Sequence, residues 1–377
     1  MELKIKQSDF LESLKWTQGI AERKSTMPVL SNVLLSTEGA GLSVKATDLE
    51  LSISVEAPCK ILKKGSVLVN AKGLLDIVRE APHKEITVSG HKDGIEIRSG
   101  KSEFKVLGMP TTEFPAFPDR KGYNPVAVPP SQLLEMLDRT AYAVSTDESR
   151  YSLNGVYLEA QPGEGKSINL RMVATDGHRL SYVDRPIEKG LQLQEGVIVP
   201  RKAIGFLHKL AEAAKGGFNV GIGQRELMVA CPAKDTDEIS VSLFVRLIEG
   251  KFPKYEQVIP KKNTRIVTLP RKSLVGALRR ADIMAQDRAH PVCFLVSPGH
   301  LEIRSANPDL GEVKEDVEVD YKGETFQVGF NARYFLDVLN VLQDEQVVLE
   351  LGDELTPCVL RSEFDRGFLA LVMPMRL

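Results

Sequence analysis

Apolar residues recur along the chain at two spacings, one typical of amphipathic helices and the other of strands. Phe10, Leu11 and Leu14 share one helical face, and apolar-rich segments at 29–35 and 42–46 follow as expected strands. This succession of one helix and several strands repeats along the chain. The other expected helices lie around 72–79, 133–139, 201–209, 274–280 and 333–342, and the other expected strands include 85–88, 94–98, 153–158, 292–296, 301–305 and 347–351.

Two landmarks return at a nearly constant interval. Lys72, Lys202 and Arg333 stand in similar segments, separated by 130 residues (202−72) and 131 residues (333−202). Asp48 and Asp176 belong to a second landmark, with an interval of 128 residues (176−48). A unit of about 130 residues has the usual size of a domain that buries its own core. The sequence therefore predicts one domain repeated three times, at 1–126, 127–262 and 263–377.

Each repeat is expected to contain two halves, and each half one helix followed by strands. This order predicts an α+β fold in which helices cover one face of antiparallel sheets. Ser8 and Ser131 precede apolar helical faces, so we expect them to cap the first helices of the first two repeats. The proline-rich segments 114–118 and 252–260 are expected to end those repeats.

The composition is typical of a soluble globular chain, with 42% hydrophobic and 27% charged residues. No apolar run is long enough to span a bilayer, and the first residues lack the apolar segment of a signal peptide. The four cysteines lie far apart without paired spacing. We therefore expect a cytoplasmic protein in which Cys59, Cys231, Cys293 and Cys358 are reduced core residues, and neither disulfide partners nor zinc ligands.

Basic residues recur at the expected start of the second helix in each repeat, at Lys72, Lys202 and Arg333. The net charge of −2 argues against a surface that binds nucleic acid everywhere, but it allows one basic face. Solvated helix faces would explain each residue singly, whereas the recurrence favours a surface that faces phosphates. No base-reading motif accompanies these residues, which fits contact with a nucleic-acid backbone without sequence preference.

The sequence offers little to a catalytic interpretation. His178 has no second histidine at metal-ligand spacing, and no nucleophile motif accompanies it. Gly221 and Gly223 lack the third glycine of a dinucleotide-binding loop. We expect no cofactor, no metal and no catalytic residue. A hydrolase that uses His178 and Asp176 remains a third-ranked alternative.

Four segments together resemble the family of bacterial DNA sliding clamps, the beta subunits of the replicative DNA polymerase. They are 174–180 (ATDGHRL), 252–255 (FPKY), 330–334 (FNARY) and 372–377 (VMPMRL), and the resemblance covers the whole chain. It implies a non-catalytic processivity factor with the DNA clamp fold. Two copies would close head to tail into a ring around double-stranded DNA. Enclosure would then keep the protein on DNA, so its contacts with DNA can be weak.

The resemblance also assigns site residues. A peptide-binding pocket for the polymerase catalytic subunit, the clamp loader, other polymerases and repair proteins would use Leu153, Thr175, Gly177, His178, Arg179, Leu180, Pro253, Val258, Val372, Met373, Pro374, Met375, Arg376 and Leu377. DNA contacts would involve Arg23, Lys24, Lys72, Arg150, Tyr151, Arg201 and Lys202, and the dimer interface Arg98, Lys101, Phe104, Val106, Ile283, Met284, Glu312 and Glu315. Gln257 stands where many relatives carry an arginine, which removes one polar contact. The runner-up is a peptide-binding scaffold of the same fold that forms no ring.

Overall fold

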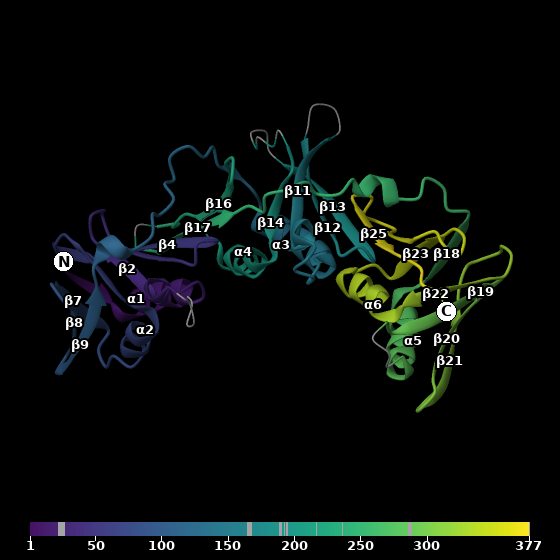
Figure 1. Ribbon diagram of the computed structural model, residues 1–377, viewed down its shortest axis with the longest axis horizontal. Coiled ribbons are helices and arrows are strands. Elements are labelled where there is room, and N and C mark those ends of the chain that lie inside the picture. Colours follow the sequence, from purple (N-terminus) through teal and green to yellow (C-terminus); the bar gives the residue numbers. More distant parts are fainter. Residues whose placement is uncertain are drawn as a thin grey trace. The chain divides into compact units, whose positions relative to one another are not determined.

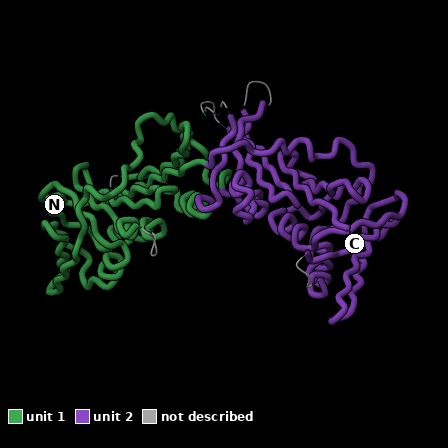
Figure 2. The backbone as a smooth tube through the Cα atoms, in the orientation of Figure 1, with its two compact units in different colours: residues 1–133, 188–192, 205–247 green, residues 134–187, 193–204, 248–377 purple. Residues whose placement is uncertain are grey.

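The computed structural model describes residues 1–21, 27–163, 168–187, 191, 193, 195–215, 217–235, 237–285 and 289–376 (Figure 1). The chain divides into two compact units (Figure 2). Unit 1 contains residues 1–133, 188–192 and 205–247, and unit 2 contains residues 134–187, 193–204 and 248–377. The second predicted repeat therefore contributes to both units.

Unit 1 contains a 13-stranded sheet in the order β10-β15-β16-β17-β4-β3-β2-β6-β9-β8-β7-β1-β5. Helices α1 and α2 pack against each other, and α1 also packs against β3 and β4. The elements are β1 (Glu2–Lys6), α1 (Gln7–Gln18), β2 (Asn32–Ser36), β3 (Leu42–Thr47), β4 (Leu51–Ala57), β5 (Lys60–Lys63), β6 (Ser66–Asn70), α2 (Ala71–Arg79), β7 (Glu85–His91), β8 (Gly94–Ser99), β9 (Ser102–Met109), β10 (Val126–Ala127), β15 (Asn219–Ile222), β16 (Glu226–Cys231) and β17 (Ser240–Arg246).

Unit 2 contains an eight-stranded sheet, β14-β11-β12-β13-β25-β24-β23-β18, and a four-stranded sheet, β21-β20-β19-β22. Helices α3 (Pro130–Thr140) and α4 (Arg201–Ala213) include residues of both units. The other elements are β11 (Gly155–Pro162), β12 (Ile168–Thr175), β13 (Arg179–Ile187), β14 (Val197–Pro200), β18 (Arg265–Pro270), α5 (Arg271–Met284), β19 (Pro291–Ser297), β20 (His300–Asn307), β21 (Gly311–Glu318), β22 (Phe326–Asn331), α6 (Ala332–Val341), β23 (Gln346–Leu351), β24 (Cys358–Ser362) and β25 (Phe368–Val372).

The element order confirms the α+β class and the six expected helices, counted over the described residues. Each half consists of one strand, one helix and then three strands, from β1-α1-β2-β3-β4 to β22-α6-β23-β24-β25, with β5 as an additional strand. The strand pairs of the described chain are antiparallel. The predicted apolar helix faces are buried, for example Leu74, Leu75 and Val78 in α2.

Two predicted helix caps are wrong. Helix α1 begins at Gln7, one residue before Ser8, and the Ser8 hydroxyl donates to the Asp9 carboxylate instead. Helix α3 begins at Pro130, so Ser131 lies inside its first turn. Proline suits the first position of a helix because its missing N–H would have no partner there. A serine next to an apolar face therefore did not mark the helix start.

The cysteine prediction is partly wrong. All four cysteines are free, but only Cys358 is buried, whereas Cys59, Cys231 and Cys293 are half-buried. Burial raises the pKa of the Cys231 thiol to about 11. The protonated thiol therefore predominates near neutral pH.

Pairing between third strands joins consecutive repeats. Strand β4, the third strand of its half, pairs with β17, and Ile53 lies opposite Leu243. Strand β13 pairs with β25 in the same way, and Leu180 lies opposite Leu371. The third strands β9 and β21 have open edges. Strand β21 ends its sheet, and β9 pairs with β6 only through Gly108 and Met109.

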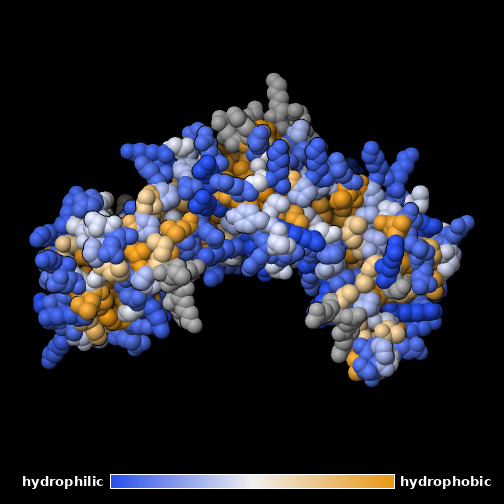
Figure 3. Space-filling view, viewed as in Figure 1, coloured by the Kyte–Doolittle hydropathy of each residue, from blue (hydrophilic) through white to orange (hydrophobic). Residues whose placement is uncertain are grey.

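The exterior is mainly hydrophilic on the face that Figure 3 shows. Inside unit 2, the rings of Phe294, Phe330 and Phe335 form a buried cluster, with centroids 4.9–5.3 Å apart. Among the described residues, no helix is long and apolar enough to cross a membrane.

A charged network fixes α3 to β13 and to the turn before β25. The Arg185 guanidinium donates to Glu135 with an Nε–Oε2 distance of 2.9 Å and to Asp365 with an Nη2–Oδ2 distance of 2.5 Å. Arg139 also pairs with both carboxylates. Burial tends to raise the pKa of Asp365, but Arg185 and Arg139 outweigh it and lower the value. The hydrogen bond from Arg185 likewise lowers the pKa of Glu135.

We expect Arg185→Ala to lower the free energy of unfolding by about 2 kcal/mol, because it leaves two partly buried carboxylates with one cation between them. Arg79→Ala, which breaks an exposed pair with Asp76, should lower the free energy of unfolding by less than about 0.5 kcal/mol.

The stabilisation by Arg185 should depend on pH. The pKa values of Glu135 and Asp365 are depressed in the folded protein, so the stabilisation is present above their ordinary values of 4.5 and 3.8 and is lost as the pH falls below them. Urea unfolding at pH 7 and pH 3 measures this difference. An equal loss of unfolding free energy in Arg185→Ala at both pH values would contradict this pH dependence.

Candidate functional site

The turn between β12 and β13 holds several predicted pocket residues in one hydrogen-bonded loop. The Thr175 hydroxyl donates to the Arg179 carbonyl at 2.6 Å and accepts from the Gly177 N–H at 3.1 Å. The Asp176 carboxylate accepts from the N–H groups of His178 and Arg179 at 2.9 and 3.0 Å. Side chains of this turn thus form hydrogen bonds with the backbone N–H and C=O groups of the same turn.

Gly177 suits the tip of this turn. Its φ is +88°, a conformation that residues with a Cβ rarely adopt. A Cβ there would also lie 2.6 Å from Nη1 of Arg150, which donates to the Asp176 carbonyl at 2.9 Å. Arg150, a predicted DNA contact, therefore supports the pocket turn from outside. Tyr151, next to it, is exposed.

Arg179 connects this turn to α6. Its guanidinium donates to Asp176 at 3.0 Å, to the Tyr142 carbonyl at 2.6 Å, and to Asp337 of α6. It also stacks between two rings, 5.4 Å from the centre of Tyr142 and 4.7 Å from that of Tyr334. Burial opposes the charge, but the contacts with Asp337 and Asp176 outweigh it and raise the pKa of Arg179. Arg179 is therefore a fixed cation.

Our sequence reasoning missed Tyr334, Tyr142 and Asp337. Tyr334 stacks on His178 with ring centres 6.3 Å apart, so it adds an aromatic wall to the predicted pocket. A signal was present, because Tyr334 follows Arg333 in one of the four segments that carry the resemblance. No comparable signal marks Tyr142, whose contact depends on how α3 ends.

The segment after β25 runs beside the same turn. Val372 pairs with Arg179, and the Met373 N–H donates to the His178 carbonyl at 2.9 Å. The Met375 N–H donates to the Gly329 carbonyl of β22 at 2.9 Å. The predicted pocket residues of this segment differ in exposure: Val372 is buried, Met373, Pro374 and Met375 are half-buried, and Arg376 is exposed. Leu377 lies outside the described residues.

The remaining predicted pocket residues lie around Tyr255. Pro253 accepts the Tyr255 N–H through its carbonyl at 2.8 Å, and Val258 ends the same short helical turn with its side chain exposed. Tyr255 packs in one apolar cluster with Leu180 and Leu371. Leu180 therefore underlies the site.

Leu153 is also buried, and it lies in the short helical turn that contains Tyr151.

The arrangement offers binding groups without a catalytic geometry. The Asp176 carboxylate is occupied by the backbone of its own turn and by Arg179, and the His178 ring stacks on Tyr334. Within the described ranges, no group of three or more His, Cys, Asp or Glu residues could hold a metal. A fixed cation, two aromatic rings and a methionine-containing segment suit an extended apolar peptide.

The three recurring cations occupy equivalent helical positions. Lys72, Lys202 and Arg333 are each the second residue of their helices, α2, α4 and α6, and each is exposed. None of these helices has an acidic residue in its first turn. Helix N-termini carry partial positive charge, so a cation there opposes helix stability and favours an anionic partner. Arg201, the first residue of α4, is also exposed.

Two of the predicted DNA contacts, Arg23 and Lys24, lie outside the described residues.

Two of the predicted interface charges, Arg98 and Glu315, have partners within the chain. Arg98 of β8 pairs with Glu96 at 2.5 Å and with Glu103 at 3.4 Å. Glu315 of β21 pairs with Arg280 of α5 at 2.6 Å. Ion pairs across an interface would therefore have to compete with these.

The other predicted interface residues are accessible to different degrees. Lys101 and Glu312 are exposed, and Ile283 is 60% exposed at the end of α5. Phe104 and Val106 are half-buried on β9, and so is Met284 on α5. Apolar side chains thus lie on β9 and on α5, which packs against β21.

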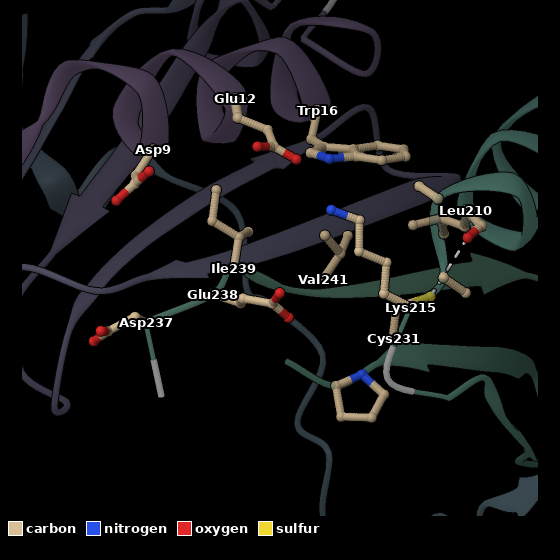
Figure 4. Close-up of a pocket in the computed structure, with 13 residues that line it drawn as sticks. Asp9, Glu12, Trp16, Leu210, Lys215, Cys231, Asp237, Glu238, Ile239 and Val241 are labelled. Carbon is tan, nitrogen blue, oxygen red and sulfur yellow. Dashed lines mark hydrogen bonds between the residues drawn. The ribbon is translucent and has the colours of Figure 1, made fainter. Parts of the chain in front are cut away.

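A separate hollow of about 180 Å³ lies within unit 1, between α1 and the end of β16 (Figure 4). Its lining includes Trp16, the half-buried Cys231, and carboxylates such as Glu12, Asp237 and Glu238. None of the predicted site residues lines it. Its negative charge is the wrong sign for DNA phosphates.

Three family models match consecutive parts of the chain. The DNA polymerase III beta subunit N-terminal domain matches residues 1–118, the central domain residues 127–254 and the C-terminal domain residues 256–376. The beta sliding clamp of Caulobacter vibrioides is 35% identical, with both chains covered completely. The beta sliding clamp of Haemophilus influenzae is 34% identical, again with complete coverage of both.

Solved structures agree. A crystal structure of the Caulobacter crescentus beta sliding clamp has a TM-score of 0.94 at 34% identity, and the DNA polymerase III subunit beta from Pseudomonas aeruginosa has 0.91 at 32%, each with both chains fully covered. A sliding clamp from Bartonella birtlesii, 33% identical with a TM-score of 0.90 and full coverage, was solved bound to griselimycin. The chain therefore belongs to the DNA polymerase III beta subunit family, and it is a sliding clamp, a non-catalytic processivity subunit.

Proposed function

We propose that two copies of this chain close head to tail into a ring around double-stranded DNA and tether the polymerase and other partners through the site described above. The observation that best supports a ring is the junction between third strands, β4 with β17 and β13 with β25. In each junction, the third strand of a repeat's first half pairs with the third strand of the next repeat's second half. The same rule applied to the open edges joins β21 of one copy to β9 of the other.

The proposed junction between β21 and β9 has unpaired strand edges and nearby apolar side chains. Strand β9 leaves one edge of residues 102–107 unpaired, and β21 is the edge strand of its sheet. Unpaired edges are prone to aggregation unless they are covered. Phe104, Val106, Ile283 and Met284 supply apolar area beside these edges. Ring closure then follows the sheet geometry already used within the chain, with boundaries near 126 and 262 between the repeats.

Contact with DNA is proposed through Lys72, Arg201 and Lys202, and also through Tyr151, Arg23 and Lys24. Cations at the starts of α2 and α4 add to the partial positive charge of those helix ends, which suits phosphate oxygens. No base-edge readout is needed, because enclosure keeps the ring on DNA. A net charge of −2 is compatible with this mode of binding.

Partner peptides are proposed to bind along the β12–β13 turn and the segment after β25, which together are referred to as the peptide groove. The main chain of Met373 is fixed to His178, while the side chains of Met373 and Met375 remain partly accessible. Methionine adapts to differently shaped apolar side chains, so one site can serve several partners.

We expect Ile283→Asp to dissociate the dimer, because it places a charge in the proposed apolar contact. The wild-type mass at micromolar concentration should be about 83.2 kDa (2 × 41.6 kDa), and the variant mass 41.6 kDa. A loss of about 3 kcal/mol corresponds to an affinity lower by about 100-fold. Size-exclusion chromatography with light scattering measures both masses. Ile266→Asp, at another exposed isoleucine, is the control and should remain dimeric. A monomeric wild-type chain would favour the scaffold without a ring.

We expect removal of residues 375–377 to abolish stimulation of polymerase extension on a primed circular template with the clamp loader, because it removes Met375 and Arg376 from the groove. The truncated protein should keep the mass of the dimer. Phe364→Ala, at a side chain 80% exposed elsewhere in unit 2, should stimulate extension normally. Full stimulation by the truncated protein would refute the peptide-site assignment while leaving the ring intact.

A further inference from the structure

A second hollow, of about 700 Å³, lies within unit 2 beside the segment after β25. Residues of β19, β20 and β21 line it, together with Met375 and Arg376. Because Met375 and Arg376 also belong to the proposed peptide groove, the hollow adjoins that groove at the segment after β25. Arg376 already belongs to the proposed peptide groove, but none of the roles assigned above accounts for Arg304 and Lys314.

The hollow is predominantly basic. Arg304, Lys314 and Arg376 line it, against the single carboxylate of Glu312. Beneath them, Glu302 pairs with both Arg304 and Lys314 and holds the two cations next to each other on neighbouring strands. With Glu302 counted, the five groups carry a net charge of +1 (three cations minus two carboxylates).

Both cations keep donors available to a ligand. Arg304 uses its Nε toward Glu302, and its side chain is 54% exposed. The Lys314 side chain is 63% exposed. Small or apolar residues lie beside them, namely Ala289, Pro291, Cys293 and Ala306, which leave space above the strands. A carboxylate entering this space would meet two positioned cations and few competing acceptors.

We propose that this hollow, referred to as the basic hollow and defined by Arg304, Lys314 and Arg376, binds an acidic residue that flanks the docking peptide of a partner. The inference rests on the proposed function of the peptide groove. Exposed ion pairs contribute modestly, so the basic hollow selects among partners that already dock. Partners with aspartate or glutamate next to the docking segment are favoured over those with lysine.

The test uses fluorescein-labelled peptides that carry the docking segment of the polymerase catalytic subunit. Two glutamates, two glutamines or two lysines are added at one end or the other, and fluorescence anisotropy measures each dissociation constant with the full-length protein. At one of the two ends, glutamates should bind about fivefold more tightly than glutamines, and lysines more weakly. Equal affinities at both ends would overturn the proposal. If no peptide binds at all, the peptide groove itself fails, and this inference fails with it.

Variants assign the preference to the basic hollow. Arg304→Gln and Lys314→Gln should each reduce the preference for glutamate while leaving the affinity of the glutamine peptide unchanged. Lys322→Gln, the same change at an exposed lysine outside the lining, should leave the preference intact. Glu302→Gln removes the carboxylate between the cations, so it should increase the preference. The assignment is contradicted if the preference for glutamate is unchanged in both Arg304→Gln and Lys314→Gln, or if it decreases in Glu302→Gln.

Salt provides a measurement on the unaltered protein. The glutamate preference should shrink as sodium chloride rises from about 50 mM to about 500 mM, because screening weakens exposed charge pairs. The affinity of the glutamine peptide should change much less. A preference independent of salt would overturn an electrostatic origin even if a variant were to fold poorly.

Discussion

The structure depends on the pairing of strand edges between repeats. Strand β17 covers the edge of β4, and β25 covers that of β13, so each junction converts two open edges into continuous antiparallel sheet. An uncovered edge presents a row of unsatisfied N–H and C=O groups, so this pairing restricts how modules can be joined. A linear chain of three such modules necessarily ends in two open edges, here β9 and β21. Pairing with a second copy, as we propose, would cover both edges.

The charge pattern follows from the same modular construction. The whole repeat recurs three times, so Lys72, Lys202 and Arg333 occupy equivalent positions in α2, α4 and α6, the helices of the second halves. A cation is unfavourable at that position for the helix itself. Arg333 already has a partner within the chain, Asp282 of α5 at 3.4 Å. For the three cations together we propose DNA phosphates as the anionic partner, in a contact that can be weak if a ring encloses the DNA.

Local features of the fold could be predicted from the sequence, because apolar spacing depends on neighbouring residues. The faces of α2, α5 and α6 are buried as expected. The helix starts at Ser8 and Ser131 were missed, since Gln7 and Pro130 begin the helices without a serine cap. The strand pairs that join repeats were not predicted, because spacing along the chain does not tell which strands pair; the joined strands β4, β17 and β25 are nevertheless richer in apolar residues than the open-edged β9 and β21. The pocket residues came from resemblance, and the contacts of Arg179 with Tyr142 and Asp337 required three-dimensional structure.

The two junctions differ in the residues of the turns beside them, and for this reason we propose a peptide site at only one of them. The turn before β4 has the same bonds as the turn before β13: Thr47 accepts from Leu49, and Asp48 accepts from Glu50 and Leu51. Leu49 and Leu51 stand where the second turn has Gly177 and Arg179. Arg246, whose N–H donates to the Glu50 carbonyl as that of Met373 donates to His178, is exposed in the first junction, and Leu49 is 48% exposed. The first turn thus lacks the glycine, the fixed arginine and the adjoining methionine of the second turn, and these are the groups that we propose to bind a partner.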